Sequence, residues 1–300
     1  MTYLVHHWTL DPFMFVALAF AGVHELGLAH LAGRSAPERT ASRRKRSYLF
    51  YAGLVLLGLT VQSPIDYWSG TYYWVHMIQH LLLAFAVPSL VVAGAPWLPL
   101  VHGLPLGFRR RLLRTLLVAR WTSPLRAVGH FLLMPWVAIV AFDTSMVFWH
   151  LPRAFDLAYR NQFVHVWLMH GSFLVFGVLF WLQFIPSYPF RRTLAPPGQI
   201  AGLFATNFVM FAIALSQSIF SPSSWYSVYA HHPGVSLSPV GSQQIGAGIL
   251  WVCGDVWCYP AIVIAVRRLM ESDGLDGALD RFLRRETRTA ALTRPTGGRS

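Results

Sequence analysis

Apolar residues occur in long uninterrupted runs rather than in the alternating or three-to-four-residue patterns of soluble strands and helices. A helix of about 20 apolar residues crosses the hydrocarbon core of a bilayer, which is roughly 30 Å thick. Several runs approach this length, and short polar segments separate them. These runs predict seven transmembrane helices, over residues 12–32, 47–63, 73–100, 128–149, 163–185, 199–220 and 243–267.

The third run is longer than one crossing requires, and it contains Pro88 and Pro96. Proline removes a backbone hydrogen bond from a helix and bends or ends it. Two interpretations stay open. Either the helix is kinked, or it ends near Gly94 and the segment WLPLVHGLPLGF lies along the membrane interface.

The overall composition agrees with a membrane protein, since 55% of the residues are hydrophobic, 12% are charged and the mean hydropathy is +0.46. A soluble domain exposes far more charge. The formal net charge of +12 would suggest a nucleic-acid partner in a soluble protein. Here the arginines lie between apolar runs, so we expect no nucleic-acid partner. The first residues, MTYLVHHWTLDP, lack the basic region and cleavage site of a secretory signal, so the first run is expected to stay in the mature protein.

Lysine and arginine are distributed unequally between alternate loops. Of 24 such residues, 22 fall in segments 34–46, 109–126 and 191–192 and in the chain from residue 267 onward, whereas Arg153 and Arg160 lie on the opposite side. Cytoplasmic loops carry the excess of positive charge. The pattern predicts an all-α bundle of seven helices, with the N-terminus outside and the C-terminus in the cytoplasm. Residues 1–270 form the transmembrane domain, and residues 271–300 form a basic cytoplasmic tail that is partly disordered.

Histidines lie close to the predicted outer ends of three of the helices. His76 and His80 open the third run four residues apart, a spacing that places both on one face of a helix. His150 ends the fourth run, and His165 and His170 open the fifth. The alternating helix directions therefore predict that five histidines meet at one depth, in a polar cleft that opens outward.

Imidazole together with thioether suits copper, because Cu(I) accepts soft sulfur donors and Cu(II) prefers nitrogen. Met77 and Met146 are possible softer ligands, as is Met169, which shares a helical face with His165 at i+4. Asp143 lies one turn deeper than Met146. A single membrane histidine more often forms an interhelical hydrogen bond, and this interpretation stays open for each residue.

Other polar residues lie deeper in the apolar runs or at their ends. Glu25 follows His24 in the first run, Asp255 lies within the seventh, and Gln243 and Gln244 open the seventh. Glu25 and Asp255 are either a proton- or cation-binding pair or two neutral, hydrogen-bonded residues that stabilise helix packing. His6, His7, His231 and His232 lie in the N-terminal segment and an outer loop, where they either capture metal at the surface or are solvated loop residues, and we favour the second interpretation.

Four segments carry a resemblance to a known family: SPIDYWSGTYYWVHMIQHLLL running into VPSLVVAGAPWLPL, then FWHLPRAFDLAYRN, then FVHVWLMHGSFLVFGVLFW, then LSPVGSQQIGAGILWVCGDVWCYP. They resemble the seven-span CtaG family of bacterial assembly factors for haem-copper cytochrome c oxidase. The resemblance implies a chaperone in the bacterial plasma membrane that delivers copper to the CuB centre of the oxidase, with an oxidase subunit and an extracytoplasmic copper donor as partners. The matching positions are His76, Gln79, His80, His150, Pro152, Asn161, His165, His170, Gln243, Gln244 and Asp255.

The chain departs from the family pattern in the first helix, where VHELGLAH places His24, Glu25 and His30 in a stretch expected to be apolar. Three alternatives remain: a copper transporter whose path continues through His24, Glu25 and Asp255, a haem protein with two histidine axial ligands, and a scaffold without metal. The sequence shows neither a nucleophile with a base nor a paired acidic metal-binding motif, so we predict that the protein is not an enzyme.

Overall fold

The computed structural model describes residues 7–190, 194–229, 237–271 and 277. Within this part the chain is helical, apart from an isolated antiparallel bridge between Ser187 and Phe190. His6, His231, His232 and nearly all of the predicted tail lie outside the described residues.

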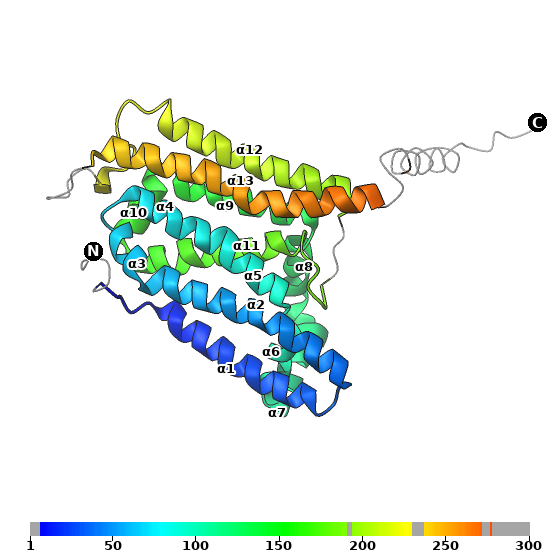
Figure 1. Ribbon diagram of the computed structural model, residues 1–300. Coiled ribbons are helices and arrows are strands. Elements are labelled where there is room, and N and C mark those ends of the chain that lie inside the picture. The colour runs from blue at the N-terminus through cyan, green and yellow to red at the C-terminus, as the bar shows by residue number, and fades with distance from the viewer. Residues whose placement is uncertain (1–6, 191–193, 230–236, 272–276, 278–300) are drawn as a thin grey trace, which may run out of the picture.

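Long helical segments lie side by side and form one bundle (Figure 1). They are α1 (Pro12–Ala32), α2 (Pro37–Gln62), α4 (Tyr73–Leu81) continuing through the π-helix η2 (Leu82–Ala86) into α5 (Val87–Gly94), α9 (Pro135–His150), the π-helix η4 (Val164–His170) continuing into α11 (Gly171–Trp181), α12 (Pro196–Ser218) and α13 (Pro239–Glu271). Helix α13 packs against α12 and α4, α2 packs against α1 and α5, and α9 packs against α11. Stacked phenylalanines fill the centre, where the Phe142 and Phe180 rings lie 4.6 Å apart.

Among the described residues, five helical segments are long and apolar enough to cross a membrane, and a bent pair of helices brings the number to six. They are Pro12–Ala32, Tyr73–Gly94, Val164–Trp181, Pro196–Ser218 and Pro239–Met270, with Arg120–Leu132 and Pro135–His150 as the bent pair. Helix α2 is absent from this set because its first turns contain arginines and only its second part is apolar. The protein is thus an all-helical protein with several candidate spans, and the seventh span and the orientation stay predictions.

The third predicted helix ends at Gly94, as one of the two interpretations of its prolines expected, whereas the position of the following segment along the membrane interface stays a prediction. Ala95 follows with a left-handed φ of 47°, and a separate short helix, α6 (Trp97–Gly103), begins after it. Helix α6 packs against α1. Glycines allow this approach, because a Cβ atom added at Gly27 would lie 1.8 Å from the carbonyl oxygen of Pro99.

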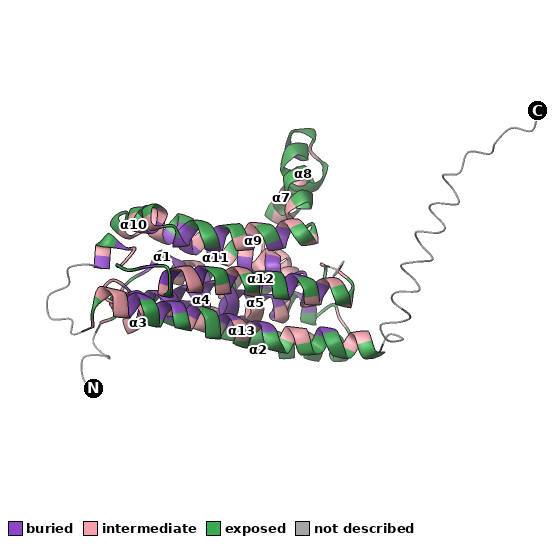
Figure 2. Cartoon of the chain, turned by 90° about the horizontal axis from the view of Figure 1, so that it is seen from above, coloured by how far each residue is buried: buried purple, intermediate pink, exposed green. Residues whose placement is uncertain are grey.

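The fourth predicted helix, over residues 128–149, is not a single helix. Its first part belongs to α8 (Ser123–Leu132), which is bent by 83° from α9. Met134 is extended, as expected for a residue before proline, and Pro135 begins α9. Helices α7 (Leu106–Val118), which precedes η3 (Arg120–Thr122), and α8 project from the side of the bundle and have no buried residues (Figure 2).

Short helices cover the opposite end of the bundle from α7 and α8. These are α3 (Pro64–Ser69), α10 (Pro152–Arg160) and η5 (Ser227–Tyr229). Asp11 begins α1 there, because its carboxylate accepts a hydrogen bond of 2.7 Å from the backbone N–H of Phe13. We call this the histidine end, since His76, His80, His150, His165 and His170 lie on helices that end or begin here.

Candidate metal centre

The five histidines predicted from the sequence gather at the histidine end, and they come from α4, α9 and η4. The distances between ring centroids join them into one cluster: 4.2 Å for His76–His80, 5.1 Å for His76–His165, 4.4 Å for His165–His170, 6.0 Å for His80–His150 and 6.1 Å for His80–His170. We call these five residues the histidine cluster. Four of them are buried and His165 is half-buried, so the cluster is enclosed and does not line the open cleft that we predicted.

His165 and His170 come together because η4 is a π-helix. In an α-helix, residues five apart point about 140° away from each other. A π-helix repeats its hydrogen bonds every five residues and brings such residues onto one face. Met169 is buried in the apolar core, and its i+4 pairing with His165 stays a prediction.

Three members of the histidine cluster are placed to share one ion. His76, His165 and His170 each offer a ring nitrogen, and these three atoms lie within 4.8 Å of one another. Small side-chain movements would bring them to the distance of about 2 Å at which imidazole nitrogens bind metals.

Most ring nitrogens of the histidine cluster have no hydrogen-bond partner within the part of the chain that the structure describes. The buried nitrogens without a hydrogen-bond partner among the described residues are Nε2 of His76, His150 and His165 and both ring nitrogens of His80 and His170. A buried polar atom without a partner costs about 1–3 kcal/mol. Several such atoms in one place are available to a ligand.

Tyr229 determines which nitrogen of His76 is available. Its hydroxyl donates to the carbonyl oxygen of Ser69 at 2.8 Å and lies 2.7 Å from Nδ1 of His76. Burial holds the pKa of the Tyr229 hydroxyl well above its ordinary value, so it keeps its one proton. Since that proton goes to Ser69, the Nδ1–H of His76 donates to Tyr229 and Nε2 keeps its lone pair.

His150 is oriented in the same way by the backbone. Its Nδ1 lies 2.6 Å from the carbonyl oxygen of Met146, an acceptor only, so Nδ1 carries the proton and Nε2 has a free lone pair. The structure therefore presents at least two histidines of the cluster in the tautomer that binds a metal through Nε2.

A layer of tyrosine and glutamine supports the cluster from the side of α12 and α13. Tyr73 donates to Gln217 at 2.7 Å, and Tyr226 donates to the carbonyl oxygen of His150 at 2.9 Å. The buried side chain of Gln243 donates a hydrogen bond to the backbone carbonyl oxygen of Gln217 and accepts one from the backbone N–H of Trp225. Gln244, in contrast, is exposed. Gln243 thus anchors the loop that carries Tyr226 and Tyr229.

Sequence reasoning missed this layer of aromatic residues. Phe155 packs 4.9 Å from the His76 ring, and Tyr226 and Tyr229 come from the segment SPSSWYSVY, to which we assigned no function from the sequence. Its aromatic content was the available signal, because an aromatic-rich loop beside buried histidines is suited to cover them.

The three candidate methionines are completely buried. Met77 lies beside Gly246 of α13, since a Cβ added there would be 3.0 Å from its side chain. Met146 and Met169 belong to the apolar core. Their role as copper ligands stays a prediction.

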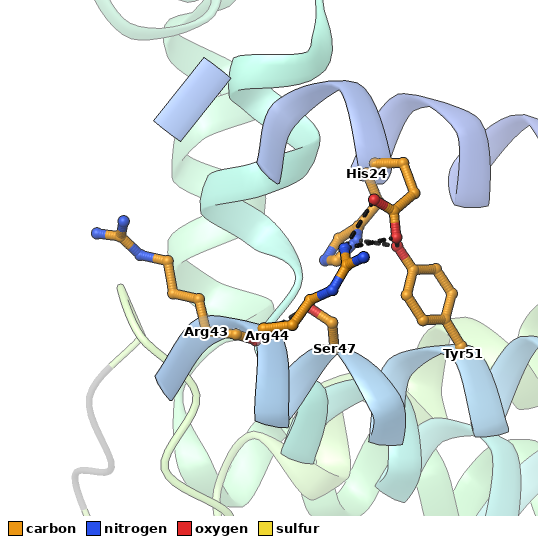
Figure 3. Close-up of polar contacts among 6 residues, drawn as sticks. His24, Arg43, Arg44, Ser47 and Tyr51 are labelled. Carbon is orange, nitrogen blue, oxygen red and sulfur yellow. Dashed lines mark hydrogen bonds and ion pairs between the residues drawn. The ribbon is translucent and has the colours of Figure 1, made fainter. Parts of the chain in front are cut away.

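The deep acidic residues do not pair with each other. Glu25 forms an ion pair of 2.8 Å with Arg44 and accepts a hydrogen bond of 2.7 Å from Tyr51 (Figure 3). Asp255 accepts from the side-chain amide of Asn207 at 2.8 Å. The sequence-based pairing of Glu25 with Asp255 is therefore wrong, because each has a partner on a neighbouring helix.

Asp143 and His24 also lie outside the histidine cluster. Asp143 is half-buried on α9, and both it and Asp255 lie near the buried thiol of Cys258. His24 bonds Tyr51 on α2 at 2.8 Å. The polar site residues predicted within the helices thus form three separate groups. These are the histidine cluster, Asp143 and Asp255 on α9 and α13, and His24 and Glu25 on α1 with their partners on α2.

Comparison with known proteins gives a family match over most of the chain. A family model described as cytochrome c oxidase caa3 assembly factor (Caa3_CtaG) matches residues 7–272. Uncharacterized proteins of Mycobacterium bovis and Mycobacterium tuberculosis are each 29% identical over 277 residues, which is 89% of this chain and 40% of the relative. One of Mycobacterium leprae is 25% identical over 245 residues, 80% of this chain and 36% of the relative. The chain therefore spans well under half the length of these relatives. No solved structure matches.

Proposed function

Because the chain belongs to the family of cytochrome c oxidase caa3 assembly factors (Caa3_CtaG), we propose that its histidine cluster binds copper and delivers it to the CuB centre of the oxidase. The observation that carries the proposal is the set of buried imidazole nitrogens without protein partners, three of which lie within 4.8 Å of one another. An assembly role of this kind requires reversible binding and no catalysis.

The donor set suits a cargo ion. Imidazole binds copper in both oxidation states, and the Nε2 lone pair of His76 is already directed away from Tyr229. Coordination by His76, His165 and His170 leaves further positions for a ligand from an acceptor protein. His80 and His150 lie next to this trio and offer donors to which the ion can move during transfer.

Access to the cluster runs past His165. Its side chain is half-buried, whereas the other four histidines are buried beneath α10 and the loop with Tyr226 and Tyr229. The arginine distribution predicts that this end faces the outside, where an extracytoplasmic copper donor and the oxidase subunit would approach.

The test is copper binding by the purified, metal-free protein. We expect the wild type to bind copper and the double variant His76→Ala, His80→Ala to lose binding and to lower oxidase activity and oxidase copper content in cells. His130→Ala is the matched control, because His130 is exposed on α8 and distant from the cluster in the fold. Unchanged copper binding and oxidase assembly in the double variant would exclude the proposal.

The geometry does not favour the two alternatives with metal. A transport path through His24, Glu25 and Asp255 is interrupted, since Glu25 bonds Arg44 and Asp255 bonds Asn207. Uptake of radiolabelled copper into proteoliposomes, lost in Asp255→Asn, would support transport instead. In a haem site the porphyrin separates its two axial histidines, which excludes the pair His76 and His80, whose ring centroids lie 4.2 Å apart. A Soret band in the purified protein would support haem.

A further inference from the structure

A second polar group lies at the other end of the bundle, away from the histidine cluster. Three arginines, Arg39, Arg43 and Arg46, line a cavity of about 260 Å³ between α2 and the segment that joins α5 to α6. The cavity lining contains Ser42 and Ser47 but no acidic residue among those that the structure describes.

The three arginines share one face of α2. Their spacing of four and then three residues places them within about 60° around the helix axis. Like charges at this spacing repel each other and destabilise a helix. Arg44 is directed away from Arg43, towards Glu25 on α1, so the carboxylate of Glu25 neutralises Arg44 (Figure 3). The arginine face therefore has excess positive charge.

His24 gives independent evidence that this cavity binds a ligand. The side chain is fully buried, it lines the cavity, and its Nε2 has no hydrogen-bond partner among the described residues. Tyr51 donates its proton to Glu25 and so accepts from the Nδ1–H of His24. Nε2 therefore carries a lone pair, which suits a hydroxyl group of the ligand.

A groove that would suit a hydrocarbon chain adjoins the cavity. It lies between α1 and α2, has a volume of about 270 Å³ and includes Tyr51, which bonds His24 of the cavity lining. Leu18 and Ala21 on α1 and Leu54 and Val55 on α2 give it apolar walls, and Leu18 and Val55 are exposed. The cavity and the groove together match an amphiphile with an anionic, hydroxyl-bearing headgroup.

We propose that this site binds one anionic phospholipid of the phosphatidylglycerol type, with its phosphate on Arg39, Arg43 and Arg46 and a headgroup hydroxyl on Nε2 of His24. Guanidinium groups bind phosphate oxygens through charge-assisted hydrogen bonds. The apolar groove favours a lipid over free phosphate as the source of the anion. The bound lipid would join α1 to α2 at the arginine-rich end.

The experiment measures lipid binding to the full-length protein. Native mass spectrometry and thermal unfolding in detergent are recorded with added phosphatidylglycerol, phosphatidylcholine or inorganic phosphate. We expect one phosphatidylglycerol to bind selectively and to raise the midpoint of unfolding by several degrees. The triple variant Arg39→Gln, Arg43→Gln, Arg46→Gln should bind it at least tenfold more weakly.

The control variant, Arg110→Gln, Arg111→Gln, Arg114→Gln, removes the same charge from exposed positions of α7 and should bind the lipid as the wild type does. Arg46→Gln alone, an exposed position that need not disturb folding, should show a smaller loss. Equal effects of phosphatidylcholine, equal losses in the control variant, or stabilisation by inorganic phosphate without lipid binding would each overturn the proposal.

Discussion

At the scale of single residues, the candidate metal centre depends on the position of a few protons. The hydroxyl of Tyr229 donates to Ser69 and accepts from His76, and this chain of two hydrogen bonds leaves Nε2 of His76 available. The backbone carbonyl of Met146 acts in the same way on His150. Neighbouring acceptors thus hold the proton of His76 and of His150 on Nδ1, so that Nε2 is free to bind an ion.

Replacing Tyr229 should weaken copper binding without removing a ligand. In Tyr229→Phe the Nδ1 of His76 loses its acceptor and the ring is no longer held in one tautomer, so we expect a 10- to 100-fold loss of affinity, typical of such partners. Competition with a chromogenic copper chelator measures it. Tyr226→Phe is the control, because Tyr226 bonds the His150 backbone and no imidazole. Equal affinities of wild type and Tyr229→Phe would contradict the assigned tautomer.

Asp11 should make the stability of the histidine end depend on pH. Burial, opposed by the hydrogen bond from Phe13 and reinforced by the charge of Asp66, raises the pKa of Asp11 to about 6. A carboxyl group with a raised pKa in the folded state contributes stability at low pH, and this is lost as the pH rises from about 4 through 6. We therefore expect the midpoint of thermal unfolding to fall over this range.

Asp11→Asn keeps an N-cap of similar strength but cannot ionise. Its unfolding midpoint should fall less than that of the wild type between pH 4.5 and 7 in differential scanning fluorimetry. Other groups titrate in both proteins alike, so the difference between the two curves isolates Asp11. Parallel curves would show that Asp11 has an ordinary pKa.

At the scale of elements, two departures from ideal α-helix shape the protein. The π-helix η4 brings His165 beside His170, and the bend of 83° between α8 and α9 turns α8 out of the bundle. Pro135 allows the bend between α8 and α9 to be predicted from the sequence. No residue of this kind predicts the π-helix η4. A π-helix is retained because its packing and its site compensate for weaker backbone hydrogen bonds.

Any side chain at Gly27 should disrupt the packing of α1 against α6 and destabilise the protein. A Cβ there would lie 1.8 Å from the carbonyl oxygen of Pro99, so Gly27→Ala must separate the helices, and we expect a loss of at least about 1–3 kcal/mol in stability. Thermal unfolding in detergent detects it. Gly22→Ala on the same helix is the control, because a Cβ at Gly22 meets nothing within 4 Å. Similar midpoints for the two variants would mean that α1 and α6 do not pack this closely.

At the scale of the whole molecule, the two ends of the bundle differ in chemistry. Helix α10, which covers the histidine cluster, lies at one end of the bundle, and α7 lies at the other (Figure 1). Arg39, Arg43 and Arg46 belong to the first turns of α2. Positive charge is retained on the cytoplasmic side of a membrane. The whole-molecule charge distribution therefore predicts that copper would be bound and released on the outer side.

Reporter fusions test this orientation. Alkaline phosphatase, which is active outside the cytoplasm, should be active when fused after Arg160 and inactive when fused after Arg114. A fluorescent protein that requires the cytoplasm to fold should give the reverse pattern. The opposite result at both positions would invert the topology and place the histidine cluster inside.

Much of the fold was predictable because hydrophobic runs and proline act locally. The first run, residues 12–32, coincides with α1, whereas the second begins ten residues after the start of α2, since the arginine-rich turns are also helical. The gathering of His76, His80, His150, His165 and His170 followed from helix direction alone. Partners across helices, such as Arg44 for Glu25 and Asn207 for Asp255, did not follow.

The sequence by itself determined the membrane character, the positions of most helices, the segregation of arginine from histidine and the family. These depend on composition and on the order of residues along the chain. Only the tertiary structure decided which histidine nitrogens are free, that η4 aligns His165 with His170, and that His24 faces three arginines. Such features arise from contacts between residues far apart in the chain, where packing selects one neighbour among several that are compatible with the same local pattern.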